Sequence, residues 1–226
     1  MAKTVDVPVT APASEPTTEH HPAALVWLQR NSKVVSYAAV AVGVIIIGGW
    51  LFIETGQRKA TAAFDALDRA RTAAAAGNLP TASAEFQRVA QNFAGTEAGY
   101  QAELALNEVR LASGQAQIAA DELRKFADKN PPAFYAAGAW FMLGGALENL
   151  KKFDEAAAAY AKSAERAEEP YRKVDGLLGA ARAYHLAGKE KESVDVLRGI
   201  VSKYGKDTPG VAEAEVRLAE RTQGRS

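Results

Sequence analysis

The side chains best suited to chemistry in this sequence are its three histidines. His20 and His21 stand side by side, and imidazoles bind transition metals, but neither a further histidine nor a cysteine stands near them. His185 follows Tyr184 and also has no second histidine or cysteine with which to build a site. The sequence therefore predicts no metal site and no histidine-based catalytic centre.

Motifs of nucleotide-binding and hydrolytic enzymes are also missing. Gly188-Lys189 and Gly205-Lys206 lack the upstream glycine of a phosphate-binding loop. The patterns H-E-x-x-H, G-x-S-x-G and G-x-G-x-x-G do not occur, and paired carboxylates such as Glu168-Glu169 fall at a predicted helix end. We therefore expect no enzyme, no cofactor and no small-molecule substrate.

Composition narrows the class of partner. The 226 residues are 48% hydrophobic and 24% charged, which is an ordinary globular balance. Lys plus Arg and Asp plus Glu number 27 each, so no net positive charge attracts nucleic acid. The absence of cysteine excludes disulfides, thiolate chemistry and lipids attached through cysteine.

The N-terminal quarter predicts a tail followed by a membrane span. Residues 1–33 form the tail, whose first 22 residues are rich in Pro and Thr, lack aromatic residues and are expected to be disordered. Residues 34–53 then run for twenty positions without a charge, enough for a helix of about 30 Å, the thickness of a bilayer's hydrocarbon layer. Trp27 and Trp50 stand where interfacial aromatic residues belong.

Two alternatives to a membrane span stay open for this apolar segment. It could be a buried core helix, although its glycines and β-branched residues disfavour that. It could be a signal peptide, since Ala60-Thr61-Ala62 resembles a cleavage site, but the run begins late and charged residues separate it from that site. As a span, it could pack on another membrane helix through Ala39 and Gly43. Basic residues flank it on both sides, and we favour a cytoplasmic N-terminus because long folded domains translocate regardless of such charges.

Beyond residue 60 the chain repeats with a period of 37 residues. Gly77 and Gly114 lie 37 residues apart, Gly188 follows twice that distance further on, and Lys151 takes the missing position. Large and small apolar residues keep the same register in four copies: Phe86, Leu123, Tyr160 and Leu197; Val89, Phe126, Ser163 and Ile200; Ala82, Ala119, Ala156 and Ser193. Such self-similarity indicates a stacked repeat architecture.

Each repeat divides into two helices at its turn. In the third repeat the helices are predicted over residues 133–150 and 153–166, and a final helix over 211–221. The expected fold is all-α: one transmembrane helix, a linker over residues 54–62, and a domain over 63–226. That domain is a right-handed α-solenoid of about four helix pairs with a C-terminal capping helix.

The third repeat resembles the tetratricopeptide repeat. Trp140, Leu143 and Gly144 match the first-helix pattern W-x2-L-G, and Ala156 and Tyr160 match the second helix. The period is 37 rather than 34 residues, and Leu147 replaces a tyrosine. Trp140 and the small residues are accordingly interpreted as packing features.

First helices of stacked pairs line a concave face, so the repeat register predicts a partner-binding groove. Phe141 and Met142 should point away from the core that holds Trp140, either into the groove or onto an adjoining repeat. The predicted groove residues are Leu104, Glu108, Phe141, Met142, Glu148, Arg182 and His185.

The order of tail, glycine-bearing span, linker and helical repeats resembles the YfgM-like family of single-pass tetratricopeptide proteins, most specifically over residues 27–64. The resemblance implies a bacterial inner-membrane protein with a periplasmic repeat domain that associates with the Sec translocon and periplasmic chaperones. It favours an adaptor or chaperone-like protein that binds translocon subunits or exported clients. The alternative is an accessory structural or assembly subunit of another large membrane complex, held through Ala39, Gly43 and its outer faces.

Overall fold

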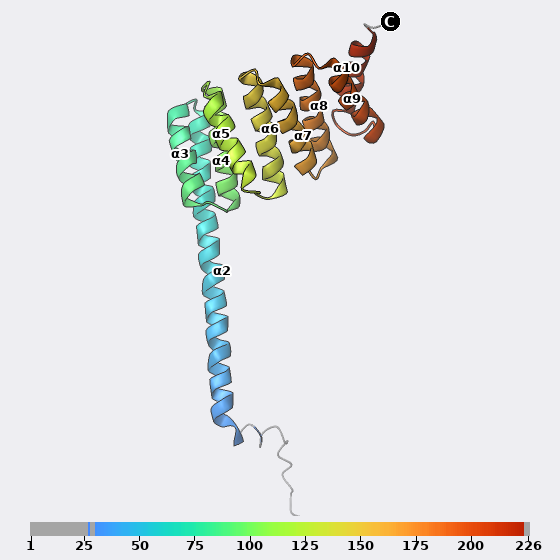
Figure 1. Ribbon diagram of the computed structural model, residues 1–226. Coiled ribbons are helices and arrows are strands. Elements are labelled where there is room, and N and C mark those ends of the chain that lie inside the picture. Colours follow the sequence, from blue (N-terminus) through green and yellow to red (C-terminus); the bar gives the residue numbers. More distant parts are fainter. Residues whose placement is uncertain (1–26, 28–29, 224–226) are drawn as a thin grey trace, which may run out of the picture. The chain divides into compact units, whose positions relative to one another are not determined.

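The computed structural model describes residues 27 and 30–223, and all regular elements in that part of the chain are helices (Figure 1). The chain divides into two units, Met1–Thr55 and Gly56–Ser226. The helices are α2 (Ser32–Ala75), α3 (Leu79–Asn92), α4 (Glu97–Ala112), α5 (Ala116–Asp128), α6 (Ala133–Asn149), α7 (Phe153–Arg166), α8 (Pro170–Leu186), α9 (Glu190–Lys203) and α10 (Val211–Gln223). The tail predicted over residues 1–33, with His20 and His21, falls almost wholly outside the described residues.

The first unit contains one helical segment that could cross a membrane. Ser32–Trp50 is 19 residues long and apolar enough for a span, and none of this segment is buried. Ile45 is 72% exposed and Ile47 is 60% exposed. Exposing such large apolar side chains to water would cost free energy. The segment is therefore suited to an apolar environment.

Residues 54–62, for which the sequence predicts a linker, are helical within α2. This stretch holds Glu, Gln, Arg, Lys and Ala, which have high helix propensity, and contains one glycine and no proline. The backbone can therefore continue in helical conformation where the apolar character ends.

The second unit is an α-solenoid of helix pairs. The end of α2 pairs with α3, α4 with α5, α6 with α7 and α8 with α9, while α10 packs on α9. Figure 1 shows the helices from α3 to α10 following one another in chain order. The observed α6 and α7 end within one residue of the bounds predicted for the third repeat. The predicted fold class is confirmed.

Every repeat turns in the same way. Gly77, Gly114 and Gly188 have φ of 74°, 75° and 76°, and Lys151, at the predicted equivalent position, has φ of 59°. The backbone N–H of Gly114 donates to the carbonyl of Leu111, and the N–H of Gln115 donates to the carbonyl of Arg110. This pair of hydrogen bonds is the Schellman pattern. The other three turns repeat this pair of hydrogen bonds. Positive φ explains why glycine recurs there.

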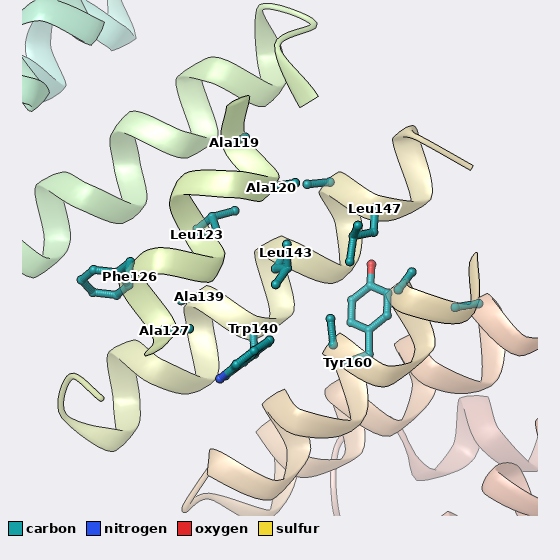
Figure 2. Close-up of a cluster of buried hydrophobic side chains, with 14 of the residues drawn as sticks. Ala119, Ala120, Leu123, Phe126, Ala127, Ala139, Trp140, Leu143, Leu147 and Tyr160 are labelled. Atoms are coloured by element: carbon teal, nitrogen blue, oxygen red, sulfur yellow. The ribbon is translucent and has the colours of Figure 1, made fainter. Parts of the chain in front are cut away.

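The three predicted registers form the core. All twelve residues at these positions in the four repeats are buried. Figure 2 shows Leu143 and Leu147 of α6 between Leu123 of α5 and the ring of Tyr160 of α7. Two buried serines in the registers are satisfied by first-helix carbonyls: Ser163 donates to Ala137 at 2.8 Å and Ser193 donates to Ala181 at 2.7 Å.

Candidate protein-binding surface

Two of the predicted groove residues occupy equivalent positions on the first helices of successive repeats. Leu104 on α4 and Phe141 on α6 lie 37 residues apart, so they occupy the same register in successive repeats. Leu104 is partly buried and Phe141 is 40% exposed. The two side chains line two different pockets on the first-helix face.

The larger pocket has a volume of about 620 Å³ and lies among the end of α2, α4 and the beginning of α6. Its walls include the predicted Leu104 and Glu108 together with Phe134 and Tyr135. Arg71 of α2 also lines the pocket and donates to the Gln101 side chain at 2.7 Å. The lining of the pocket is mainly apolar.

The smaller pocket has a volume of about 260 Å³ and lies between α6 and α8. Phe141 and Met142, two of the predicted groove residues, line it, and Tyr171 forms part of the α8 wall. Phe141 also packs edge-on against Tyr160, with ring centroids 5.2 Å apart. The Phe141 ring therefore contacts Tyr160 of its own repeat at one edge while 40% of the residue remains exposed.

Phe134 and Arg172 connect the two pockets. The Arg172 guanidinium lies 3.9 Å from the centroid of the Phe134 ring, and Phe134 belongs to the larger pocket while Arg172 lines the smaller one. This cation–π contact crosses from α6 to α8. The pockets thus form adjoining parts of one surface.

Glu148 and Arg182 form an ion pair between the third and fourth repeats. Arg182 donates to both carboxylate oxygens of Glu148, at 3.0 and 3.1 Å, and donates to the Tyr160 hydroxyl at 2.9 Å. Burial, reinforced by the Glu148 carboxylate, raises the pKa of the Tyr160 hydroxyl to about 12. These two predicted groove residues are brought together, but they face each other and act as an inter-repeat bridge.

His185 lies apart from both pockets. Its Nδ1 is 2.7 Å from a carboxylate oxygen of Glu190, across the α8–α9 turn. This hydrogen bond is the main reason that the pKa of Glu190 lies below its usual value. Arg221 of α10 also approaches Glu190, at 3.4 Å, so His185 belongs to a contact that joins the last helices.

Trp140 lies in the core, as the sequence predicts. It is 8% exposed and packs in the largest apolar cluster, and Lys162 of α7 lies 4.2 Å from its ring centroid. Gly144 has a more specific role than the sequence suggests. A Cβ there would lie 2.7 Å from the ring of Tyr160, and a Cβ at Gly179 of α8 would lie 2.6 Å from it. Tyr160 fits because both neighbouring helices present glycine to its ring.

Three surface residues escaped the sequence analysis: Phe134, Tyr171 and Asp175. The repeat register could have found two of them, because Tyr171 follows Phe134 by 37 residues, and Phe134 precedes Phe141 by seven, two helical turns on the same face. Asp175 occupies the register of Gln101 and Gly138, where residue type varies. Within residues 27 and 30–223, no group of three or more His, Asp or Glu side chains could hold a metal ion.

Comparison with known families identifies the repeats. The model of the tetratricopeptide repeat-like domain matches residues 26–173, about two thirds of the chain. The chain belongs to the tetratricopeptide repeat-like domain family. The match begins just before the apolar segment and ends in the first turn of α8, so that most of the fourth helix pair and all of α10 lie beyond it.

Solved tetratricopeptide structures share the fold. TPR-like repeats of a Podosopora anserina protein described as a kinesin light chain align with a TM-score of 0.56 at 18% identity, covering 70% of this chain and 84% of that chain. The MamA protein aligns with a TM-score of 0.56 at 16% identity, covering 72% of this chain and 82% of that chain. Comparison with curated proteins finds no match. A tetratricopeptide fold is a scaffold for protein–protein interaction, because its stacked pairs create an extended concave face.

Proposed function

We propose that this protein is a membrane-anchored adaptor that binds other proteins through the first-helix face of its repeats. The observation that carries the proposal is the set of aromatic side chains exposed there. Phe134 is 51% exposed, Tyr171 is 41% exposed and Phe141 is 40% exposed, and all three line the adjoining pockets. Aromatic residues in such pockets are typical anchors for a partner's side chains.

The anchor in this proposal is the apolar segment of α2. Residues 34–53 cross the bacterial inner membrane, residues 1–33 lie in the cytoplasm, and residues 63–226 carry the repeats in the periplasm beyond the connecting residues 54–62. The length, composition and exposure of Ser32–Trp50 support the span. The resemblance to YfgM-like proteins supports the location and suggests translocon subunits, periplasmic chaperones or exported chains as partners.

The test is photo-crosslinking in cells that carry the full chain. A photoreactive residue at Phe141 reports on the groove, and one at Ala39 reports on the membrane helix. Ile118 on α5 serves as the matched control, because it is an apolar residue with 50% exposure outside both pockets. We expect translocon subunits or exported chains at Phe141 and no such products at Ile118.

Capture of a single membrane complex at Ala39, with little at Phe141, would overturn the adaptor function and support the alternative of a structural or assembly subunit. The mass of the mature protein tests the anchor separately. A chain shortened to begin near Ala60-Thr61-Ala62 would identify the apolar segment as a cleaved signal peptide.

A further inference from the structure

The smaller pocket combines apolar walls with a carboxylate that forms no ion pair within the described part of the chain. Asp175 on α8 lines this pocket beside Phe141, Met142 and Tyr171. Among the described residues, no side chain forms a hydrogen bond or an ion pair with the Asp175 carboxylate. Its neighbours in the pocket wall are aromatic or aliphatic, apart from Arg172 and the Ser163 hydroxyl, which donates to a backbone carbonyl.

Arg172 is already engaged by other groups. Its guanidinium lies over the Phe134 ring, its Nε lies 3.8 Å from a carboxylate oxygen of Glu169, and the same Nε lies 3.2 Å from the Tyr171 hydroxyl. Glu169 and Arg172 therefore offset each other. The negative charge of Asp175 is left in excess at this pocket.

Glu213 of α10 adds to that excess. Burial raises the pKa of Asp175, and the Glu213 carboxylate raises it further, while Arg172 acts in the opposite direction. Glu213 itself pairs with Arg217 on its own helix. Asp175 is an exposed residue, so a cation supplied by a partner can reach its carboxylate and offset the negative charge that Glu213 reinforces.

We propose that the smaller pocket binds an apolar side chain of a partner segment that carries Lys or Arg next to that side chain. The apolar group occupies the space between Phe141 and Tyr171, and the cation pairs with Asp175. The inference rests on the proposed adaptor function and specifies its partner as a basic and apolar segment. The larger pocket adds apolar area without a charge preference, because its charged residues, Arg71 and Glu108, have opposite signs.

Fluorescence anisotropy with two labelled peptides tests this inference. Both peptides carry the same tryptophan and leucine anchors, and each anchor is flanked by lysine in one peptide and by glutamate in the other. The full chain is held in uncharged detergent micelles, and empty micelles give the baseline. We expect the lysine peptide to bind at least about threefold more tightly than the glutamate peptide, with a difference that shrinks as salt is added.

Two variants place the effect at Asp175. Asp175→Asn removes the charge while keeping the shape of the side chain, and it should abolish the preference for lysine while the apolar binding remains. Glu165→Gln on α7 is the matched control, since Glu165 is exposed and lines neither pocket, and it should leave the preference unchanged. Far-UV circular dichroism confirms that both variants keep the fold.

Equal binding of the two peptides, or an unchanged preference in Asp175→Asn, would overturn the inference. Failure of both peptides to bind would overturn it as well. Crosslinking from Phe141 to a partner would still support the adaptor function in each of these cases, so the two failures are distinguishable.

Discussion

Tyr160 shows how single residues hold neighbouring repeats at a fixed separation. Its ring is buried between Gly144 of α6 and Gly179 of α8, and its hydroxyl joins Glu148 and Arg182. The ring and the two glycines are complementary in shape. A small residue on each flanking helix is therefore as necessary as the aromatic ring between them.

Replacing either glycine by alanine should destabilise the repeats. The added Cβ at Gly144 or Gly179 would lie within 2.7 Å of the Tyr160 ring, and overpacking of this kind costs about 1–3 kcal/mol. Gly138→Ala is the matched control on α6, because its Cβ would meet only Leu104, at 3.4 Å. The control should be neutral or more stable by up to about 1 kcal/mol through helix propensity. Urea unfolding of the full chain measures all three, and equal stabilities would refute the close fit.

Ionisation of Tyr160 predicts a loss of stability in alkaline solution. Since its pKa is raised from 10.0 to about 12 in the folded chain, the unfolded chain loses the proton at lower pH. This contribution to stability is complete below pH 10 and is lost as pH rises from 10 to 12. Tyr160→Phe should reduce the loss across that interval, as measured by urea unfolding at a series of pH values. An unchanged slope in the variant would contradict the prediction.

At the scale of elements, the same turn joins the two helices of every repeat. The four turns share positive φ at residues 77, 114, 151 and 188 and the same two backbone hydrogen bonds. Only the third turn has a side chain at that position, Lys151. The geometry of the turn therefore dictates glycine, and Lys151 departs from it at some energetic cost.

Lys151→Gly should stabilise the third repeat. Removing the Cβ relieves left-handed strain of about 1 kcal/mol, partly offset by the greater freedom of glycine in the unfolded chain. Gly114→Ala should do the reverse in the second repeat, with a loss of about 1 kcal/mol. Thermal unfolding followed by circular dichroism compares the two. Loss of stability in Lys151→Gly would show that the lysine side chain makes a compensating contact.

At the scale of the whole repeat domain, α10 covers the last helix pair. Val211 and Ala214 are buried in the cluster that includes Leu197 and Ile200 of α9. Terminal helices with this role protect the open end of a solenoid from solvent. The Arg221–Glu190 contact and the adjoining His185 hold the same end by polar interactions.

Deleting the chain from Val211 onward should lower stability and solubility. Burial of the Val211 side chain alone contributes about 1.5–3 kcal/mol, and the deletion also exposes apolar side chains of α8 and α9. Val216→Ser is the control, because Val216 is 59% exposed on the same helix. Thermal unfolding and the soluble fraction after expression measure both variants. A deleted chain as stable as the control would show that α10 has a different role.

Much of the fold was predictable because repeats make contacts that are close in sequence. Each repeat packs on its neighbours, so the 37-residue register located the four turns and the buried positions, and the tetratricopeptide pattern indicated the core role of Trp140. The same register put Leu104, Glu108, Phe141 and Met142 on first helices, where they line the two pockets. These features are determined by local periodicity, which the sequence carries directly.

The tertiary structure decided which side chains meet across helices. It paired Glu148 with Arg182, placed His185 against Glu190 and seated Tyr160 between two glycines, and among the described residues it left Asp175 without an ion pair. These outcomes depend on distances of a few ångströms between side chains of different repeats. A period fixes which face a residue occupies but leaves the partner undetermined, because side-chain reach and the separation of helices are set only when the whole stack is packed.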